Sequence, residues 1–460
     1  MSKIKYNSKR FYLILLLVSI LFIMVFVNTS CTKTNSESIG TNQANTSTTK
    51  EQQADNETST TTNEAEGIVS VTIWDSCEPK ERIFLMESIN NFIKLNPKIS
   101  INIKHFRNED ELDDVFSASS LAGAGPEMIL AGFDSMQKLI KENIIKDMTN
   151  EIDYNIFFPG LVEISNFDGK KYIVPFSSSN FLILYYNKDL INEIPSTFDE
   201  IVTLSKESLD AKDPKYGILF NAAEPEWTIP FIGGYLDWIY DYDSGAINLD
   251  SVAMENTLNF INNLYTVDKI IPKNFGYEDM NDLFKNGGAA MIINDVSVIN
   301  EYKDAGLNFG VAKIPRNADG STNPTPMISG LGFMVNNNCS SKSFEAVKDF
   351  IEYMISKDIQ INWTLNTSSF PSILGLENDQ LLNNDIIYNV LLQAKICRGK
   401  PKEDDLRLIR DVLKLNIESI IAGNITPEDA KNKMQEDIIK LKSGEIKVED
   451  YSSTTTSKEN

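Results

Sequence analysis

Carboxylates and aromatic side chains follow several of the strands that the sequence predicts. Asp75 and Glu78 come after an apolar strand predicted for residues 69–74, and Asp134 comes after another predicted for residues 127–131. Carboxylates accept hydrogen bonds from hydroxyl groups, and aromatic rings cover apolar C–H faces, so together they suit an uncharged, hydroxyl-rich ligand such as an oligosaccharide. Further candidates of both kinds lie later in the chain: Glu226, Trp227, Tyr235, Trp238 and Asp295.

Other kinds of site lack the residues they need. The only histidine, His105, continues an alternating strand face, so no histidine and cysteine metal site is predicted. Neither a P-loop nor a G-x-G-x-x-G motif occurs, and no cofactor is predicted. A secreted glycosidase needs a positioned acid with a nucleophile or base, and no spacing here identifies such a pair. A binding protein is therefore favoured over an enzyme. Two alternatives to a sugar-binding receptor remain: a protein that binds a cationic ligand such as a polyamine, and a ligand sensor.

Strands alternate with helices in the first part of the chain. A helix is predicted for residues 80–95, with a core stripe made of Ile83, Met86, Ile89, Phe92 and Ile93. Alternation of this kind predicts a parallel sheet with its ligand crevice at the carboxyl ends of the strands. The remaining predicted elements are strands at 99–106, 181–186, 289–294 and 330–335 and helices at 109–121, 251–268, 344–355 and 406–422.

Length and charge limit the possible partners. A chain of 460 residues is longer than one core usually fills, so two domains are expected. The formal net charge of −22 argues against nucleic acid as a partner and against direct adsorption to anionic lipid.

The N-terminus has the pattern of an export signal. Lys3, Lys5, Lys9 and Arg10 precede an apolar run, which small residues and Cys31 follow. This order predicts a lipoprotein signal peptide at 1–30 with Cys31 as the acylated first residue. Asn28 stands where such signals usually carry an aliphatic residue, so an uncleaved anchor is the alternative. Composition predicts a disordered tether at 31–67 and a disordered tail at 451–460.

Several motifs in order resemble one family. They are the Gly-Lys pair at 169–170 before a strand that ends at Pro175, L-Y-Y-N-K-D-L at 184–190, P-S-T-F-D-E-I at 195–201, F-K-N-G-G-A-A-M at 284–291 and F-P-S at 370–372. This series resembles the bacterial extracellular solute-binding proteins of ABC importers, in their maltose-binding protein-like, carbohydrate-binding branch.

The resemblance implies a two-lobed α/β fold of the type II periplasmic-binding-protein kind, each lobe a mainly parallel sheet flanked by helices. The implied N-terminal lobe is 69–177 plus 311–368, and the implied C-terminal lobe is 180–308 plus 371–448. The chain is expected to cross between the lobes, through hinges, near 177–180, 309–312 and 370–372.

The resemblance also implies a role. A monomeric receptor, lipid-anchored on the outer face of the cytoplasmic membrane, would close its lobes on a sugar and deliver it to permease subunits. Asp134 falls at a sugar-binding aspartate, Ser76 or Glu78 near another polar contact, and Glu226-Trp227 near a stacking aromatic that is shifted here by one position. Ser297 replaces another of the family's stacking residues, so the ligand need not be a maltodextrin.

Overall fold

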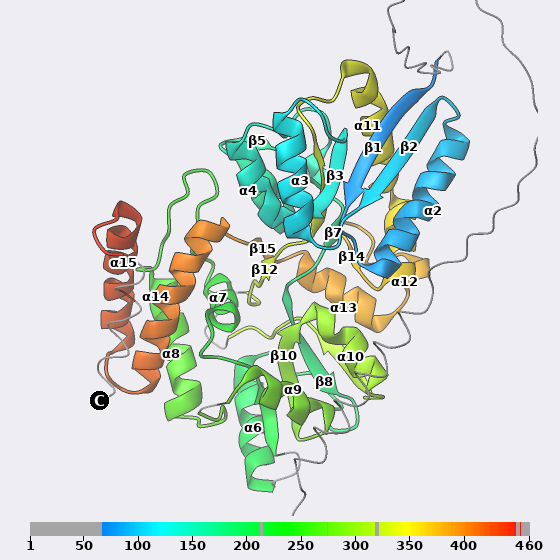
Figure 1. The fold of residues 1–460 in the computed structure, drawn as a ribbon. Helices are drawn as coiled ribbons and strands as arrows, with labels where there is room; N and C mark the ends of the chain where they lie inside the picture. The colour runs from blue at the N-terminus through cyan, green and yellow to red at the C-terminus, as the bar shows by residue number, and fades with distance from the viewer. Residues whose placement is uncertain (1–66, 212–214, 274, 318–321, 448–450, 452–460) are drawn as a thin grey trace, which may run out of the picture. The chain divides into compact units, whose positions relative to one another are not determined.

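The structure is a computed structural model that describes residues 67–211, 215–273, 275–317, 322–447 and 451 (Figure 1). The predicted signal peptide, the predicted tether up to residue 66 and residues 452–460 lie outside the described residues. Within the described part of the chain, no helix has the length and apolar character needed to cross a membrane.

The first sheet has the strand order β2-β1-β3-β13-β6. Among its described strands, β13 runs antiparallel to both of its neighbours, and the others share one direction. The strands are β1 (Val69–Asp75), β2 (Ile99–His105), β3 (Met128–Gly132), β6 (Val174–Pro175) and β13 (Leu331–Val335). Its flanking helices are α2 (Pro79–Leu95), α3 (Glu109–Leu121), α4 (Phe133–Lys141), α5 (Pro159–Ser165), α11 (Ser341–Met354) and α12 (Lys357–Thr367).

The second sheet, ordered β11-β8-β10-β9, is built in the same way with β8 as its antiparallel strand. Its strands are β8 (Leu182–Asn187), β9 (Tyr216–Leu219), β10 (Ala289–Asp295) and β11 (Phe309–Ala312). The helices are α6 (Phe198–Ala211), α7 (Pro225–Gly234), α8 (Val252–Thr266), α9 (Tyr277–Lys285), α10 (Ile299–Asp304), α13 (Asp385–Ala394), α14 (Glu403–Ile421) and α15 (Pro427–Ser443). α13 packs on β11, and α14 packs against α7, α8 and α15.

Short paired segments carry the chain between the two sheets. β7 (Ser177–Ser178) pairs with β14 (Phe370–Pro371), and β12 (Met327–Ile328) pairs with β15 (Arg398–Gly399). Ser179 and Ser329 form a further bridge. The crossings predicted near 177–180 and 370–372 therefore lie side by side. The remaining short elements are β4 (Asn166–Phe167), β5 (Lys170–Lys171) and the 3-10 turns η1 (Tyr154–Ile156), η2 (Val296–Val298) and η3 (Gln380–Leu382).

The return crossing predicted at 309–312 is wrong. Those residues form β11, which pairs with β8 along its whole length, so residues 311 and 312 belong to the second sheet. The chain returns later, at 327–330, where Ser329 bridges to Ser179. A fully buried strand carries no local mark of the sheet it joins, because either core accepts its apolar side chains.

Two smaller predictions also differ from the structure. Ile83 and Met86, assigned to the core stripe of α2, are 60% and 41% exposed, whereas Phe84 and Phe92 are buried. The helix turns a neighbouring face inward because Phe84 packs edge-on against Trp363 at 5.5 Å. Tyr451, assigned to the disordered tail, is buried and its hydroxyl donates to Asp437 at 2.8 Å.

Candidate functional site

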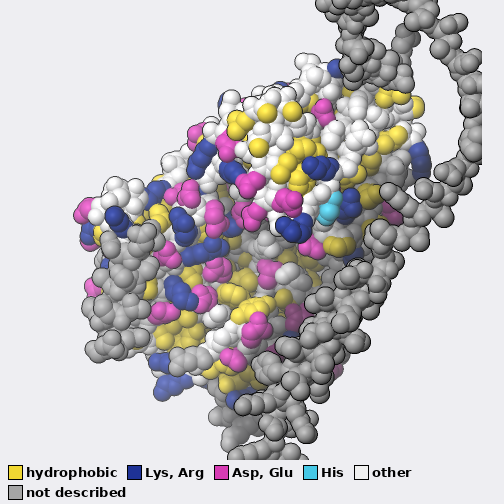
Figure 2. Space-filling view, in the orientation of Figure 1, with side chains coloured by type: hydrophobic (Ala, Val, Ile, Leu, Met, Phe, Trp, Pro, Cys, Tyr) yellow, Lys and Arg dark blue, Asp and Glu magenta, His cyan; other side chains and the backbone are white. Residues whose placement is uncertain are grey.

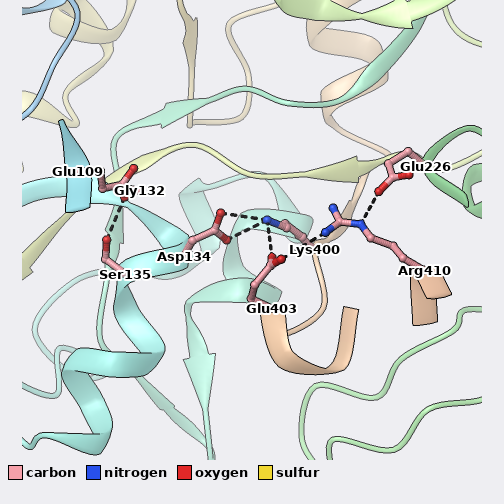
Figure 3. Close-up of polar contacts among 8 residues, drawn as sticks. All are labelled: Glu109, Gly132, Asp134, Ser135, Glu226, Lys400, Glu403 and Arg410. Atoms are coloured by element: carbon pink, nitrogen blue, oxygen red, sulfur yellow. Dashed lines mark hydrogen bonds and ion pairs between the residues drawn. The ribbon is translucent and has the colours of Figure 1, made fainter. Parts of the chain in front are cut away.

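Asp134 stands in the first turn of α4, directly after the carboxyl end of β3. Glu109 fixes this helix start: its Oε1 accepts the backbone N–H of Gly132 at 2.7 Å and the hydroxyl of Ser135 at 2.9 Å (Figure 3). A Cβ at position 132 would lie 2.4 Å from that oxygen, so a larger residue would push the Glu109 carboxylate out of this position. The Asp134 side chain is left 59% exposed and points toward Lys400.

A chain of ion pairs runs from Asp134 to Glu226 (Figure 3). Lys400 Nζ lies 3.0 and 2.9 Å from the two oxygens of Asp134 and 2.9 Å from Glu403 Oε2. The other oxygen of Glu403 accepts Arg410 Nη1 at 3.2 Å, and Arg410 Nε donates to Glu226. The chain thus links α4, beside the first sheet, to α14 and α7, beside the second.

Positive and negative side chains are also mixed on the face of the molecule that Figure 2 shows. Figure 2 shows basic and acidic side chains interspersed rather than gathered into one patch. Within the described ranges, no group of three His, Cys, Asp or Glu side chains is arranged to hold a metal ion.

A small pocket lies against this ion-pair chain. Its lining includes Phe133, Asp134, Lys400, Lys402 and Glu403, and its volume is about 40 Å³. Pockets for small organic ligands usually have roughly 300–1,000 Å³. A sugar ring therefore does not fit into this pocket as the structure shows it.

Trp238 lines a neighbouring pocket of about 740 Å³. The indole N–H donates to the hydroxyl of Tyr242 at 3.0 Å, and the Arg398 guanidinium lies 5.2 Å from the ring centroid. Arg398 also pairs with Glu163 at 2.7 Å; burial outweighs this partner, so the pKa of Glu163 lies above its ordinary value. One face of the Trp238 ring is thus already covered by a cation.

Glu226 and Trp227 lie on the helix α7 rather than in a loop after a strand. Pro225 occupies the first turn of α7, where its missing N–H costs nothing, and Pro230 is accommodated within the helix. Trp227 Nε1 donates to the carbonyl of Ile293, in β10, at 2.8 Å. Its partly buried ring is therefore fixed against the second sheet. Tyr235 ends the same helix and is half-buried.

The candidates that follow β1 and β10 do not join the ion-pair chain. Asp75 is completely buried, where it accepts the Cys77 N–H at 3.2 Å and contacts His105 Nδ1 at 2.8 Å. Ser76 is half-buried and Glu78 is exposed at the start of α2. Asp295 caps a short turn by accepting the Ser297 N–H at 2.9 Å, and burial raises the pKa of its carboxyl. Of the nine predicted residues, the ion-pair chain connects only Asp134 and Glu226.

Sequence reasoning missed Lys400, Glu403 and Arg410. Lys400 follows a glycine, and Glu403 lies in the first turn of α14, where an acidic residue usually interacts with the helix dipole. Neither position carries a local signal of binding, because Asp134 is 266 residues away in the chain.

Asp113, next to this site on α3, gives a pH-dependent prediction. Burial, opposed by a Ser135 hydrogen bond and reinforced by the charge of Glu109, raises its pKa from 3.8 to about 6. The folded state thus binds the proton more tightly than the unfolded state, so this group's contribution to stability falls as the pH rises from about 4 to 6. Asp113→Asn should raise the free energy of unfolding by on the order of 1 to 2 kcal/mol at about pH 7.5 and leave it unchanged near pH 4.

Urea unfolding at both pH values checks this expectation. Asp114→Asn is the control, because Asp114 lies on the same helix with 77% of its side chain exposed. An Asp113 variant that follows the parent at both pH values would contradict the assignment.

Comparison with known proteins agrees with the two-sheet architecture. A family model described as bacterial extracellular solute-binding protein matches residues 87–389. The maltotriose-binding protein of Pyrococcus abyssi is 24% identical over 83% of this chain and 85% of its own. The maltooligosaccharide ABC transporter solute-binding lipoprotein of Streptococcus pneumoniae is 23% identical over 72% and 81%, respectively.

A solved structure gives the fold independently. The maltose-binding periplasmic protein MalE from Listeria monocytogenes, in complex with maltose, superposes with a TM-score of 0.71 at 20% identity. The match covers 82% of this chain and 99% of that one. The predicted two-lobed α/β fold of the type II periplasmic-binding-protein kind is therefore confirmed.

Proposed function

Because the chain belongs to the bacterial extracellular solute-binding protein family, we propose that it captures a sugar or oligosaccharide between its lobes for an ABC importer. The observation that carries the proposal is the pocket beside Asp134, Lys400 and Glu403, where α4 of one lobe meets α14 of the other. Carboxylates at such a meeting point can accept hydroxyl hydrogen bonds from a ligand enclosed by both lobes.

Sugar is favoured over other solutes by two independent facts. The similar proteins named above bind maltotriose, maltooligosaccharides or maltose, as their names state. The ion-pair chain also neutralises most of its own charge, which leaves polar acceptors rather than a strongly charged site. Binding without turnover is part of the proposal, since these relatives are named as binding proteins.

Delivery requires the lobes to open and close. The roughly 40 Å³ pocket is too small for a sugar ring, so binding beside Asp134 needs a more open form. The paired crossings at 177–180, 327–330 and 370–372 supply the hinges, because rotation there leaves both sheets intact. The closed form would then present a surface to the permease subunits.

A thermal-shift screen tests the function. Maltose, maltotriose, galactooligosaccharides, spermidine and a mixed peptide pool are added in turn, and a ligand that binds only the folded state raises the melting temperature. A neutral oligosaccharide should give the largest shift and be recovered unaltered by mass spectrometry. A larger shift with spermidine would select the cationic alternative, and cleavage products would identify an enzyme.

We expect the receptor to be held at the outer face of the cytoplasmic membrane through a lipid on Cys31. Replacing Cys31 with serine should release the protein from the membrane or leave it unprocessed. Mass spectrometry of the mature N-terminus and membrane fractionation measure this. Unchanged size with unchanged membrane retention would indicate an uncleaved anchor instead.

A further inference from the structure

Lys400 has no hydrogen-bond donor left for a ligand. An ammonium group carries three N–H donors, and three carboxylate oxygens surround this one: both from Asp134, at 3.0 and 2.9 Å, and one from Glu403, at 2.9 Å. The lysine side chain is only 19% exposed. Its donors are therefore fully committed to protein groups.

The two carboxylates, in contrast, keep acceptor capacity. Each ionised carboxylate has about four lone-pair directions, of which Lys400 and Arg410 occupy two on Asp134 and two on Glu403. The Asp134 and Glu403 side chains are 59% and 48% exposed, and both line the pocket. These two carboxylates therefore present hydrogen-bond acceptors to a ligand, next to Lys402, which lines the same pocket with its ammonium 4.1 Å from the Phe167 ring centroid.

The ammonium is also what allows these acceptors to lie together. Asp134 belongs to α4 and Glu403 to α14, and without a cation between them two negative groups this close would repel. Burial opposes the charge on Lys400, but the charges and hydrogen bonds of Asp134 and Glu403 outweigh it and raise the pKa of the lysine. Lys400 therefore stays charged through the neutral pH range.

We propose that Lys400 is a positioning residue that holds Asp134 and Glu403, from different lobes, as one accepting surface for neighbouring hydroxyl groups of a single sugar ring. This inference rests on the proposed function. Two adjacent carboxylates favour hydroxyl groups, which donate hydrogen bonds to them. The ligand class is thus a sugar with adjacent free hydroxyls.

Calorimetry with the full mature chain tests the positioning role. The probe is maltotriose, or the oligosaccharide with the largest thermal shift if that is another sugar. Lys400→Met should weaken binding at least about tenfold, because Asp134 and Glu403 are no longer held together and one of them loses its hydrogen bond to the sugar; Lys400→Arg should recover part of the loss. The double variant with Lys400→Met and Asp134→Asn should lose less binding free energy than the sum of the losses in the two single variants.

Lys285→Met is the matched control. Its ammonium also lies between two carboxylates, Asp282 at 2.9 Å and Glu301 at 2.8 Å, with 25% of the side chain exposed. It belongs to α9 and lines no described pocket, so its loss should leave affinity unchanged.

A ligand-free measurement separates this role from general stability. Limited succinylation followed by peptide mass mapping should modify Lys400 slowly in the parent and at least about fivefold faster in Asp134→Asn, since the lysine loses its principal partner. Parental affinity in Lys400→Met, or an unchanged succinylation rate, would overturn the inference while leaving sugar binding intact. A screen in which no sugar binds would remove the proposed function and this inference together.

Discussion

Replacing Gly330 with alanine should destabilise the protein by about 3 kcal/mol, at the upper end for an overpacked site. Gly330 lies between β12 and β13, where the chain returns to the first lobe. A Cβ there would lie 2.0 Å from the carbonyl oxygen of Ser177 and 3.2 Å from Ser178 Cα. Because the obstructing atoms are backbone of the adjacent crossing, no side-chain rotation can relieve the contact.

Urea unfolding measures the loss, and Gly276→Ala provides the control. A Cβ at Gly276 meets its nearest neighbour, Asp279, at an ordinary 3.6 Å, so Gly276→Ala should cost only about 1 kcal/mol, the penalty for alanine at the N-cap of α9. Gly330→Ala should also reduce the change in radius of gyration that a bound oligosaccharide causes. Parental stability together with parental closure would show that the two crossings can separate freely.

Replacing Asp134 with alanine should weaken oligosaccharide binding by about tenfold to a hundredfold. Hydrogen bonds to a charged group contribute roughly 1.5 to 3 kcal/mol, and the change also leaves Lys400 with a single carboxylate partner. Isothermal titration calorimetry with the sugar found in the thermal screen gives the affinity directly.

Asp114→Ala is the control for this change. Asp114 pairs with Lys138 of the same helix α4 at 2.7 Å, but 77% of its side chain is exposed and it lines no described pocket. Its replacement should leave affinity at the parental value. A folded Asp134→Ala protein that also binds at the parental affinity would place the ligand elsewhere, even with the family unchanged.

The sequence predicts the elements of this fold well where apolar residues repeat. The buried strand predicted at 181–186 is β8 (Leu182–Asn187), and the helix predicted at 251–268 is α8 (Val252–Thr266). Such segments are specified locally, because each carries its own periodic apolar side chains. The sheet that a strand joins is decided by tertiary pairing, which is why 309–312 was assigned to a crossing.

The candidate site was predictable only in part for the same reason. Asp134 follows a strand, where a ligand crevice is expected, and α/β topology alone identifies it. Lys400 acquires its role only because α14 begins beside α4 in the folded chain. Trp227 was predicted to be a ligand contact, yet Pro225 beside it marks a helix start, and its indole donates to a carbonyl of the second sheet.

The antiparallel strand of the first sheet has a consequence for the order in which the protein can form. β13 lies between β3 and β6 in the first sheet, although it follows both of them in the chain by more than a hundred residues. In the second sheet, β11 is likewise the last strand to be synthesised, after β10. An emerging chain that ends before residue 335 therefore lacks an interior strand of its first sheet, and β3 and β6 have no partner between them. We expect such a chain to remain unfolded until late in synthesis, which is the state in which an exported protein must be threaded through a membrane.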